Sequence, residues 1–170
     1  MSGGFIKEHG QAFSRSLLEA EGFEGWVPFS ALGQTECPRG HGVYAVYWPK
    51  EVEPEFLKSS RGGWFKGKDP TVSTSALNDN WVANADIIYI GCSHGEKSDL
   101  RKRLSAFRRF GDGKAVGHWG GRLIWQIAQT DLMRVGWKTT ERDEARSLEK
   151  LLLERFIRSF DRRPFANLTH

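Results

Sequence analysis

Two apolar stretches, each bounded by a glycine, place the strongest constraint on how this chain can fold. Residues 42–47 read Gly-Val-Tyr-Ala-Val-Tyr, and residues 86–91 read Asp-Ile-Ile-Tyr-Ile-Gly. Both are rich in β-branched and aromatic residues, which is typical of buried strands. Alternate side chains of a strand face opposite sides of a sheet, so Tyr44 should share a face with Val46. We therefore predict two adjacent strands that each carry a tyrosine.

Length and cysteine content favour a single reduced domain. The chain has 170 residues, of which 39% are hydrophobic, enough for one sizeable core and too few for two. Cys37 and Cys92 do not have the spacing of a metal site. No charged region is followed by a long apolar run near the N-terminus, so we expect a cytoplasmic protein without signal peptide, membrane span or membrane partner.

Charge is unevenly distributed along the chain. Residues 1–57 contain four Lys/Arg and eight Asp/Glu, a net charge of −4, so residues 58–170 carry +8 within the total of +4. The basic part would attract a phosphate-rich partner such as nucleic acid. Many moderately basic proteins bind no nucleic acid, so charge favours this class of partner only modestly.

Helical periodicity predicts three helices. A short one over residues 11–20 ends at Gly22 and is followed by an apolar clip of Phe23, Trp26 and Phe29. A basic helix runs from Ser98 or Asp99, as its N-cap, to about Phe110, and its buried stripe is Leu100, Leu104 and Phe107. The pattern Thr140-Glu-Arg-Asp143 is a capping box that opens the longest helix, about 141–160.

The rest of the chain supplies a third strand and an insertion. We predict the third strand at 122–128, and the run at 132–137 is a candidate fourth strand. Proline and glycine break the long segment 49–85, yet its aromatic residues favour an ordered insertion. Trp64, Phe65 and Trp81 would either attach it to the core, the favoured interpretation, or stack on nucleic acid.

The predicted fold class is α/β, with a small, mainly antiparallel three-stranded sheet at 42–48, 86–91 and 122–128, flanked by helices. Residues 1–41 form an N-terminal helical decoration, and residues 42–170 form the main domain.

Glu149 is the anomalous residue of the longest helix. At about 100° per residue it lies near the middle of an apolar arc that includes Ala145, Leu152 and Phe156. Burying a carboxylate among such neighbours is costly unless a cation or hydrogen bonds compensate it. Two interpretations remain open, a buried ion pair with an arginine or a metal ligand.

The basic helix has one arginine that differs from the others. Arg103 lies at the edge of the apolar face and should point toward the sheet, where it could pair with Glu149 or with a phosphoryl oxygen. The remaining cations of this helix project away from the stripe and are candidate nucleic-acid-binding residues, namely Arg101, Lys102, Arg108 and Arg109.

Five short motifs, taken in order, resemble those of the GIY-YIG nuclease family. They are Gly42-Val43-Tyr44, Tyr89-Ile90-Gly91, Leu100-Arg-Lys-Arg103-Leu104, Ala145-Arg-Ser-Leu148-Glu149-Lys-Leu-Leu152 and Pro164-Phe-Ala-Asn167. Gly-Val-Tyr alone is a weak signal, but the combination is specific and spans most of residues 42–167. Residues 1–41 and the insertion at 49–85 lie outside it.

The resemblance implies hydrolysis of a DNA phosphodiester through one Mg²⁺ or Mn²⁺ ion. Glu149 would be the metal ligand together with water, Tyr44 the general base, and Tyr89 the residue that positions the attacking water. Arg103 would stabilise charge on phosphorus, and Asn167 would support the site.

Two positions depart from the family pattern. Cys92 stands where many members carry a basic residue or histidine directly after Tyr-Ile-Gly, and Phe107 replaces an aromatic hydroxyl. His94 could substitute for the missing basic residue. His118, between glycines, could reach the active site or a phosphate, or be a loop histidine held by Trp119.

The resemblance favours restriction-like or repair-like cleavage of duplex or branched DNA. The alternatives are a catalytically inactive nucleic-acid-binding module, favoured by Cys92 and opposed by Glu149, and an assembly subunit whose interface is the insertion.

Overall fold

A four-stranded antiparallel sheet forms the centre of the computed structural model, which describes residues 12–35 and 37–168. The spatial order is β1-β4-β2-β3, with β1 at Glu24–Val27, β2 at His41–Tyr47, β3 at Ile87–Ser93 and β4 at Arg134–Thr140. All three pairings are antiparallel. The α/β class with an antiparallel sheet flanked by helices is confirmed, whereas the prediction of three strands is wrong.

The two strands predicted from residues 42–47 and 86–91 are adjacent, as expected. Tyr44 of β2 is opposite Gly91 of β3 on one side and Trp137 of β4 on the other. Because β3 is the last strand of the sheet, it pairs with a strand on one side only.

The predicted strand at 122–128 is wrong. This segment belongs mainly to η2, a 3₁₀ helix at Trp119–Gln126, and Ile127 makes only an isolated bridge to Phe56. Residues 123–127 are all buried, and periodicity cannot distinguish a short, wholly buried strand from a buried helical segment. The side chain of Gln126 binds the insertion, with Nε2 donating to the carbonyls of Leu57 and Val72.

Two other segments complete the sheet. The candidate strand at 132–137 forms β4 and extends to Thr140. The apolar clip after the first helix contains β1, where a Cβ on Gly136 would lie 2.5 Å from the Trp26 ring. Glycine at 136 therefore makes room for the Trp26 indole on the sheet.

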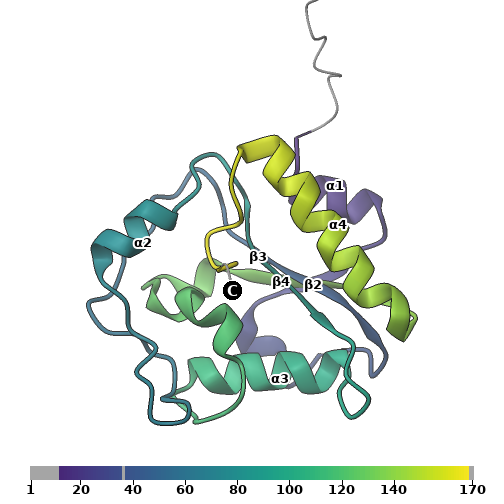
Figure 1. Ribbon diagram of the computed structural model, residues 1–170, viewed down its shortest axis with the longest axis horizontal. Helices are drawn as coiled ribbons and strands as arrows, with labels where there is room; N and C mark the ends of the chain where they lie inside the picture. Colours follow the sequence, from purple (N-terminus) through teal and green to yellow (C-terminus); the bar gives the residue numbers. More distant parts are fainter. Residues whose placement is uncertain (1–11, 36, 169–170) are drawn as a thin grey trace, which may run out of the picture.

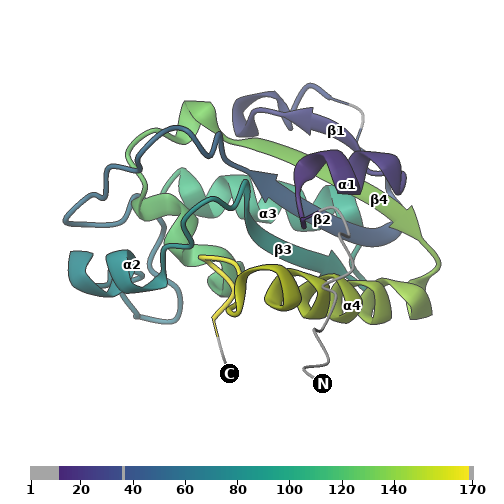
Figure 2. The same ribbon diagram turned by 90° about the horizontal axis from the view of Figure 1, so that it is seen from above.

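The helices cover both faces of the sheet (Figures 1 and 2). Val43 and Ala45 pack in the cluster that includes α1, Arg15–Ala20, and α4, Arg142–Phe160. Tyr44 and Val46 pack on the opposite face with α3, Leu100–Gly111, and η2. This alternation is the two-residue period of a strand buried on both faces.

The helix ends test the capping predictions. Asp99 is the N-cap of α3, and its carboxylate accepts from the Lys102 amide at 2.7 Å. The capping box of α4 is not formed, because Thr140 Oγ1 donates to the Glu141 carbonyl at 2.8 Å instead of accepting an amide. Ser14 caps α1, and Gln11 of the predicted 11–20 helix lies outside the described residues.

The insertion is more regular than predicted. It contains α2 at Thr74–Asn80, and its Trp81 packs against Trp48 and Phe165 at ring distances of 5.9 and 5.1 Å. Trp81 therefore attaches the insertion to the core, as the favoured interpretation expected. Two one-turn 3₁₀ helices, η1 at Phe29–Ala31 and η3 at Thr130–Leu132, complete the fold.

No helix in the described part of the chain is long and apolar enough to cross a membrane.

Candidate active site

A cavity of about 840 Å³ opens beside β3 and gathers residues that are distant in sequence. Six of the seven predicted catalytic and auxiliary residues line it, namely Tyr44, Tyr89, His94, Arg103, Glu149 and Asn167. The seventh, His118, does not line the cavity but forms a hydrogen bond with Tyr44. The structure thus brings the predicted residues together.

The position of β3 explains how residues from both helical layers meet. Arg103 belongs to α3 on one face of the sheet, and Glu149 belongs to α4 on the other. Ile90, Gly91 and Cys92 of β3 also line the cavity. Since β3 is an edge strand, side chains from the two faces can converge past its outer side.

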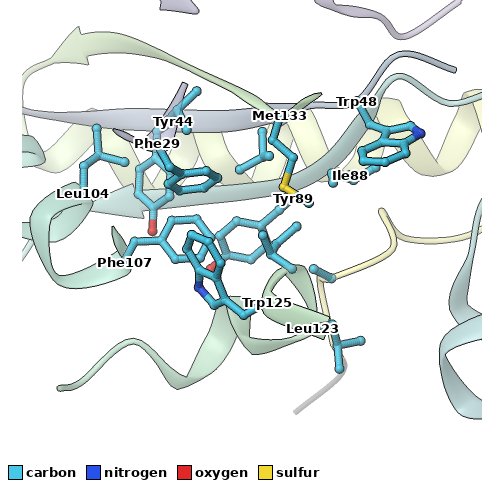
Figure 3. Close-up of a cluster of buried hydrophobic side chains, with 14 of the residues drawn as sticks. Phe29, Tyr44, Trp48, Ile88, Tyr89, Leu104, Phe107, Leu123, Trp125 and Met133 are labelled. Atoms are coloured by element: carbon cyan, nitrogen blue, oxygen red, sulfur yellow. The ribbon is translucent and has the colours of Figure 1, made fainter. Parts of the chain in front are cut away.

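Gly91 provides the space that Tyr44 occupies. A Cβ on Gly91 would lie 2.5 Å from both Cζ and the hydroxyl oxygen of Tyr44, far inside van der Waals contact. The Tyr44 and Tyr89 rings lie 6.1 Å apart, and both pack against Phe107 (Figure 3). The glycine of Tyr-Ile-Gly therefore sets the position of the tyrosine of the neighbouring strand.

His118 is the buried partner of Tyr44. Its Nε2 lies 2.9 Å from the Tyr44 hydroxyl, and its ring stacks on Phe107 with centroids 4.0 Å apart and an interplanar angle of 5°. Burial, reinforced by the charge of Arg103, lowers the pKa of His118 well below its usual value, so the imidazole is neutral. The ring therefore stacks on Phe107, whereas one of the two alternatives for this histidine named Trp119.

The environment of His118 favours one tautomer. Its Nδ1 is buried and has no hydrogen-bond partner among the described residues. A buried N–H without an acceptor is rarer in proteins than an unsatisfied acceptor, which favours the proton on Nε2. In that tautomer Nε2–H donates to the Tyr44 oxygen.

Tyr44 is a neutral phenol at ordinary pH. Burial raises the pKa of Tyr44 to about 12, against the lowering effect of the nearby Arg103 guanidinium. The imidazole donor and the guanidinium both favour the tyrosinate form, whereas burial disfavours it.

Arg103 faces the cavity, as predicted. Its side chain is half-buried, and one guanidinium nitrogen donates to the Gly117 carbonyl at 3.0 Å. A guanidinium has five N–H donors, so this bond leaves others available to an anion in the cavity.

Glu149 lies at the margin of the buried face of α4 and not in its middle. Ala145, Leu152 and Phe156 are buried, whereas Glu149 and Leu153 are half-buried and line the cavity. The helical wheel overestimated the burial of Glu149, because the wheel treats every apolar neighbour as buried and Leu153 is only half-buried. Among the described residues Glu149 forms no ion pair, so the structure does not contain the first of the two alternatives, a buried pair with arginine.

Cys92 and His94 occupy the position where the chain departs from the family pattern. Burial, aided by Glu149, raises the pKa of the Cys92 thiol to about 12, so Cys92 supplies no charge. His94 is exposed, with Nδ1 3.4 Å from the Cys92 sulfur, and it lines the cavity. His94 therefore lies beside Cys92 at this position.

Asn167 holds the C-terminal segment against β3. Its side-chain oxygen accepts from the Ile90 amide at 2.9 Å, and its Nδ2 donates to the Ile90 carbonyl at 2.8 Å. These bonds replace the missing neighbour strand at this point of the edge, next to Tyr89. The observed contacts give Asn167 a positioning role.

Three cavity arginines escaped the sequence analysis: Arg122, Arg146 and Arg163. Arg146 precedes Glu149 by three residues and shares its helix face, so helical spacing was sufficient to find it. Arg122 was missed because its segment was assigned to a strand, and no sequence pattern marks Arg163.

The predicted nucleic-acid-binding residues of α3 lie elsewhere. Arg101 and Arg108 line a separate cavity of about 420 Å³ with residues 32–35, and Lys102 and Arg109 are exposed. Arg101 also donates to the Cys37 carbonyl at 3.0 Å, and Arg108 lies 3.6 Å from Asp112.

In the described residues, no group of three or more His, Cys, Asp or Glu side chains is arranged to hold a metal ion. Comparisons with protein-family models, curated proteins and solved structures found no match for this chain.

Proposed function

We propose that this protein is a metal-dependent endonuclease of the GIY-YIG type that hydrolyses DNA phosphodiester bonds. The observation that carries the proposal is the convergence of Tyr44, Tyr89, Arg103 and Glu149 on one cavity. These residues come from four elements and span more than a hundred positions, and the family resemblance selects the same four.

The charge of the cavity supports a phosphate substrate. Four arginines line it, namely Arg103, Arg122, Arg146 and Arg163, against the single carboxylate of Glu149. Arginine binds phosphate through paired N–H donors, and phosphoryl transfer requires mainly positioned charge. A strand with several phosphates would find more than one partner here.

Glu149 suits a divalent cation. Its carboxylate lines the cavity and has no ion-pair partner among the described residues. Mg²⁺ in phosphoryl-transfer sites is commonly bound by one or two carboxylates and several waters, and Mn²⁺ also prefers oxygen ligands. A bound ion would supply Lewis-acid stabilisation of charge on the phosphate and a more acidic water.

Tyr44 is the candidate general base. As a tyrosinate it would take the proton of the attacking water onto its hydroxyl oxygen, while His118 Nε2–H and Arg103 stabilise the negative oxygen. Tyr89, packed beside Phe107 on the same side of the sheet, would orient that water. Arg103 would then stabilise the charge that develops on phosphorus.

Glu149→Gln tests the proposal, with Glu154→Gln as matched control because Glu154 is an exposed residue of the same helix. The wild type should cleave plasmid or branched DNA with Mg²⁺ or Mn²⁺ and not with EDTA. Glu149→Gln should abolish cleavage without weakening DNA binding, since it removes only the anionic ligand, and Glu154→Gln should cleave normally. Cleavage by Glu149→Gln at the wild-type rate would contradict the proposal.

The same assay addresses the alternative of an inactive binding module. The neutral thiol of Cys92 favours that alternative, because it stands where many family members carry a basic residue. DNA binding by a wild type that does not cleave with either metal would support it.

A further inference from the structure

Residues 61–68 of the insertion, here called the rim turn, form a tight hairpin at the edge of the cavity. The Phe65 amide donates to the Lys68 carbonyl at 3.2 Å, and the Lys68 amide donates back to the Phe65 carbonyl at 3.0 Å. The two residues between them, Lys66 and Gly67, have φ of 52° and 74°. Two consecutive positive φ values are typical of a type I′ turn, and the second position of such a turn favours glycine.

The rim turn is attached to the core by two backbone hydrogen bonds on the N-terminal side of its tip. The Gly63 amide donates to the Phe110 carbonyl at the C-terminal end of α3, at 2.9 Å, and the Arg61 amide donates to the Trp125 carbonyl at 3.0 Å. A Cβ on Gly63 would lie 2.0 Å from the Lys114 carbonyl oxygen, so only glycine allows this close approach. Figure 1 shows the insertion reaching this end of α3.

Two neighbouring aromatics of the rim turn differ in exposure. Phe65 is half-buried and lines the cavity, and a Cβ on Gly117 would lie 3.7 Å from its ring, while Trp64 is 60% exposed. Trp64 is the most exposed large hydrophobic residue of the described chain. The packing of the fold does not account for an exposed indole whose sequence neighbour lines a basic cavity.

Cations accompany the aromatics on this side of the cavity. Lys66 Nζ lies 5.4 Å from the Phe65 ring centroid, and the Arg122 guanidinium lies 4.6 Å from the Trp119 ring centroid. Phe65, Trp119 and Arg122 all line the cavity. Aromatic faces interleaved with cations are the pattern of surfaces that bind unpaired nucleic-acid strands.

We propose that the rim turn binds an unpaired DNA strand next to the bond that is cut, with Trp64 stacking on a base. The inference rests on the proposed function and narrows its substrate class to branched or single-strand-flanked DNA. In an uninterrupted duplex the base faces are covered by their neighbours, so Trp64 could stack only on a base that has left the helix. The lysines of the turn and the cavity arginines would contact the phosphates on either side.

The test measures binding of the full chain in EDTA to fluorescent single-stranded thymidine oligonucleotide and to a blunt duplex of equal length. Trp64→Ala should weaken single-strand binding by about 5- to 100-fold, the loss of one stacked base, and leave duplex binding unchanged. Trp64→Phe should retain most of the affinity because it keeps an aromatic face. Leu151→Ala is the matched control, since Leu151 is 45% exposed on α4 and does not line the cavity.

The outcomes separate this inference from the proposed function, because binding in EDTA requires no catalysis. Strand-selective loss in Trp64→Ala supports the inference even if no metal produces cleavage. Unchanged single-strand binding, or equal loss for strand and duplex, overturns it even if the enzyme cleaves DNA. Equal melting temperatures of the variants verify that the fold is intact.

Discussion

Tyr44 and His118 form a buried hydrogen-bonded pair. The charge of Arg103 affects the ionisation of the two side chains in opposite senses. Both side chains are fully buried, at 0% exposure, and Arg103 acts on both. The guanidinium favours a tyrosinate at Tyr44 and disfavours an imidazolium at His118. Both side chains are therefore neutral, and Tyr44 is the one whose charged form Arg103 stabilises.

Acid should destabilise the protein through His118. Its pKa is lowered well below 6.5 in the folded state by burial, so between that value and 6.5 the unfolded chain binds the extra proton. The free energy of unfolding should then rise with pH up to about 6.5 and be level above, with a maximal contribution of about 1.4 kcal/mol per pH unit. His118→Gln, which cannot titrate, should show a shallower dependence in denaturant titrations between pH 5 and 7.5.

Wild type, measured in parallel, serves as the control. If His118→Gln and wild type lose stability equally on acidification, His118 is not the group responsible.

At the scale of elements, β3 is the strand on which the site depends. It pairs with β2 on one side, and on its other side it receives the C-terminal segment through the Ala166 amide and the Asn167 side chain. The same strand contributes Tyr89 and the glycine that makes room for Tyr44. A single substitution in β3 should therefore impair the candidate active site more than it impairs folding.

Gly91→Ala should impair the site by displacing Tyr44. The new Cβ would lie 2.5 Å from the Tyr44 hydroxyl oxygen, so the ring must move and its hydrogen bond to His118 must break. Overpacking of this kind costs about 1–3 kcal/mol, measurable by denaturation, and cleavage should be lost. Gly95→Ala is the control, since its Cβ would meet only Ser98 at 3.6 Å. Wild-type cleavage by Gly91→Ala would show that Tyr44 is not the base.

Across the whole molecule, the arginines form two separate surfaces. Arg122 and Arg163 line the large cavity beside β3, whereas Arg101 and Arg108 line the smaller cavity against residues 32–35. On α3 the second pair lies on the side of the helix opposite Arg103. These arginines are therefore divided between two cavities.

The salt dependence of DNA binding distinguishes the two surfaces. Each phosphate contact contributes about −0.9 to the slope of log affinity against log salt on duplex DNA. Arg122→Gln with Arg163→Gln should reduce the steepness of that slope by about 2. Arg101→Gln with Arg108→Gln removes the same charge from the other surface and should leave the slope near wild type. The reverse result would move the binding surface to the outer side of α3.

Much of the local structure was predictable because it is encoded in short periods. The two-residue alternation predicted β2 and β3. Helical spacing predicted α3 and α4, and it indicated that Arg103 points toward the sheet. Periodicity failed where burial is complete or where pairing is distant. Residues 123–127 are wholly buried and are mostly 3₁₀ helix, and β1 exists only because β4 lies beside it.

The sequence alone was sufficient to select Tyr44, Tyr89, Arg103 and Glu149 as candidate site residues, because each lies in a short contiguous motif. Only the tertiary structure decided that β3 is an edge strand, which lets residues from opposite faces share one cavity. It also decided that His118 lies on Phe107 and bonds Tyr44, and that Arg122 and Arg163 join the site. Local spacing specifies the direction of a side chain within its own element, whereas its partner depends on how distant elements pack.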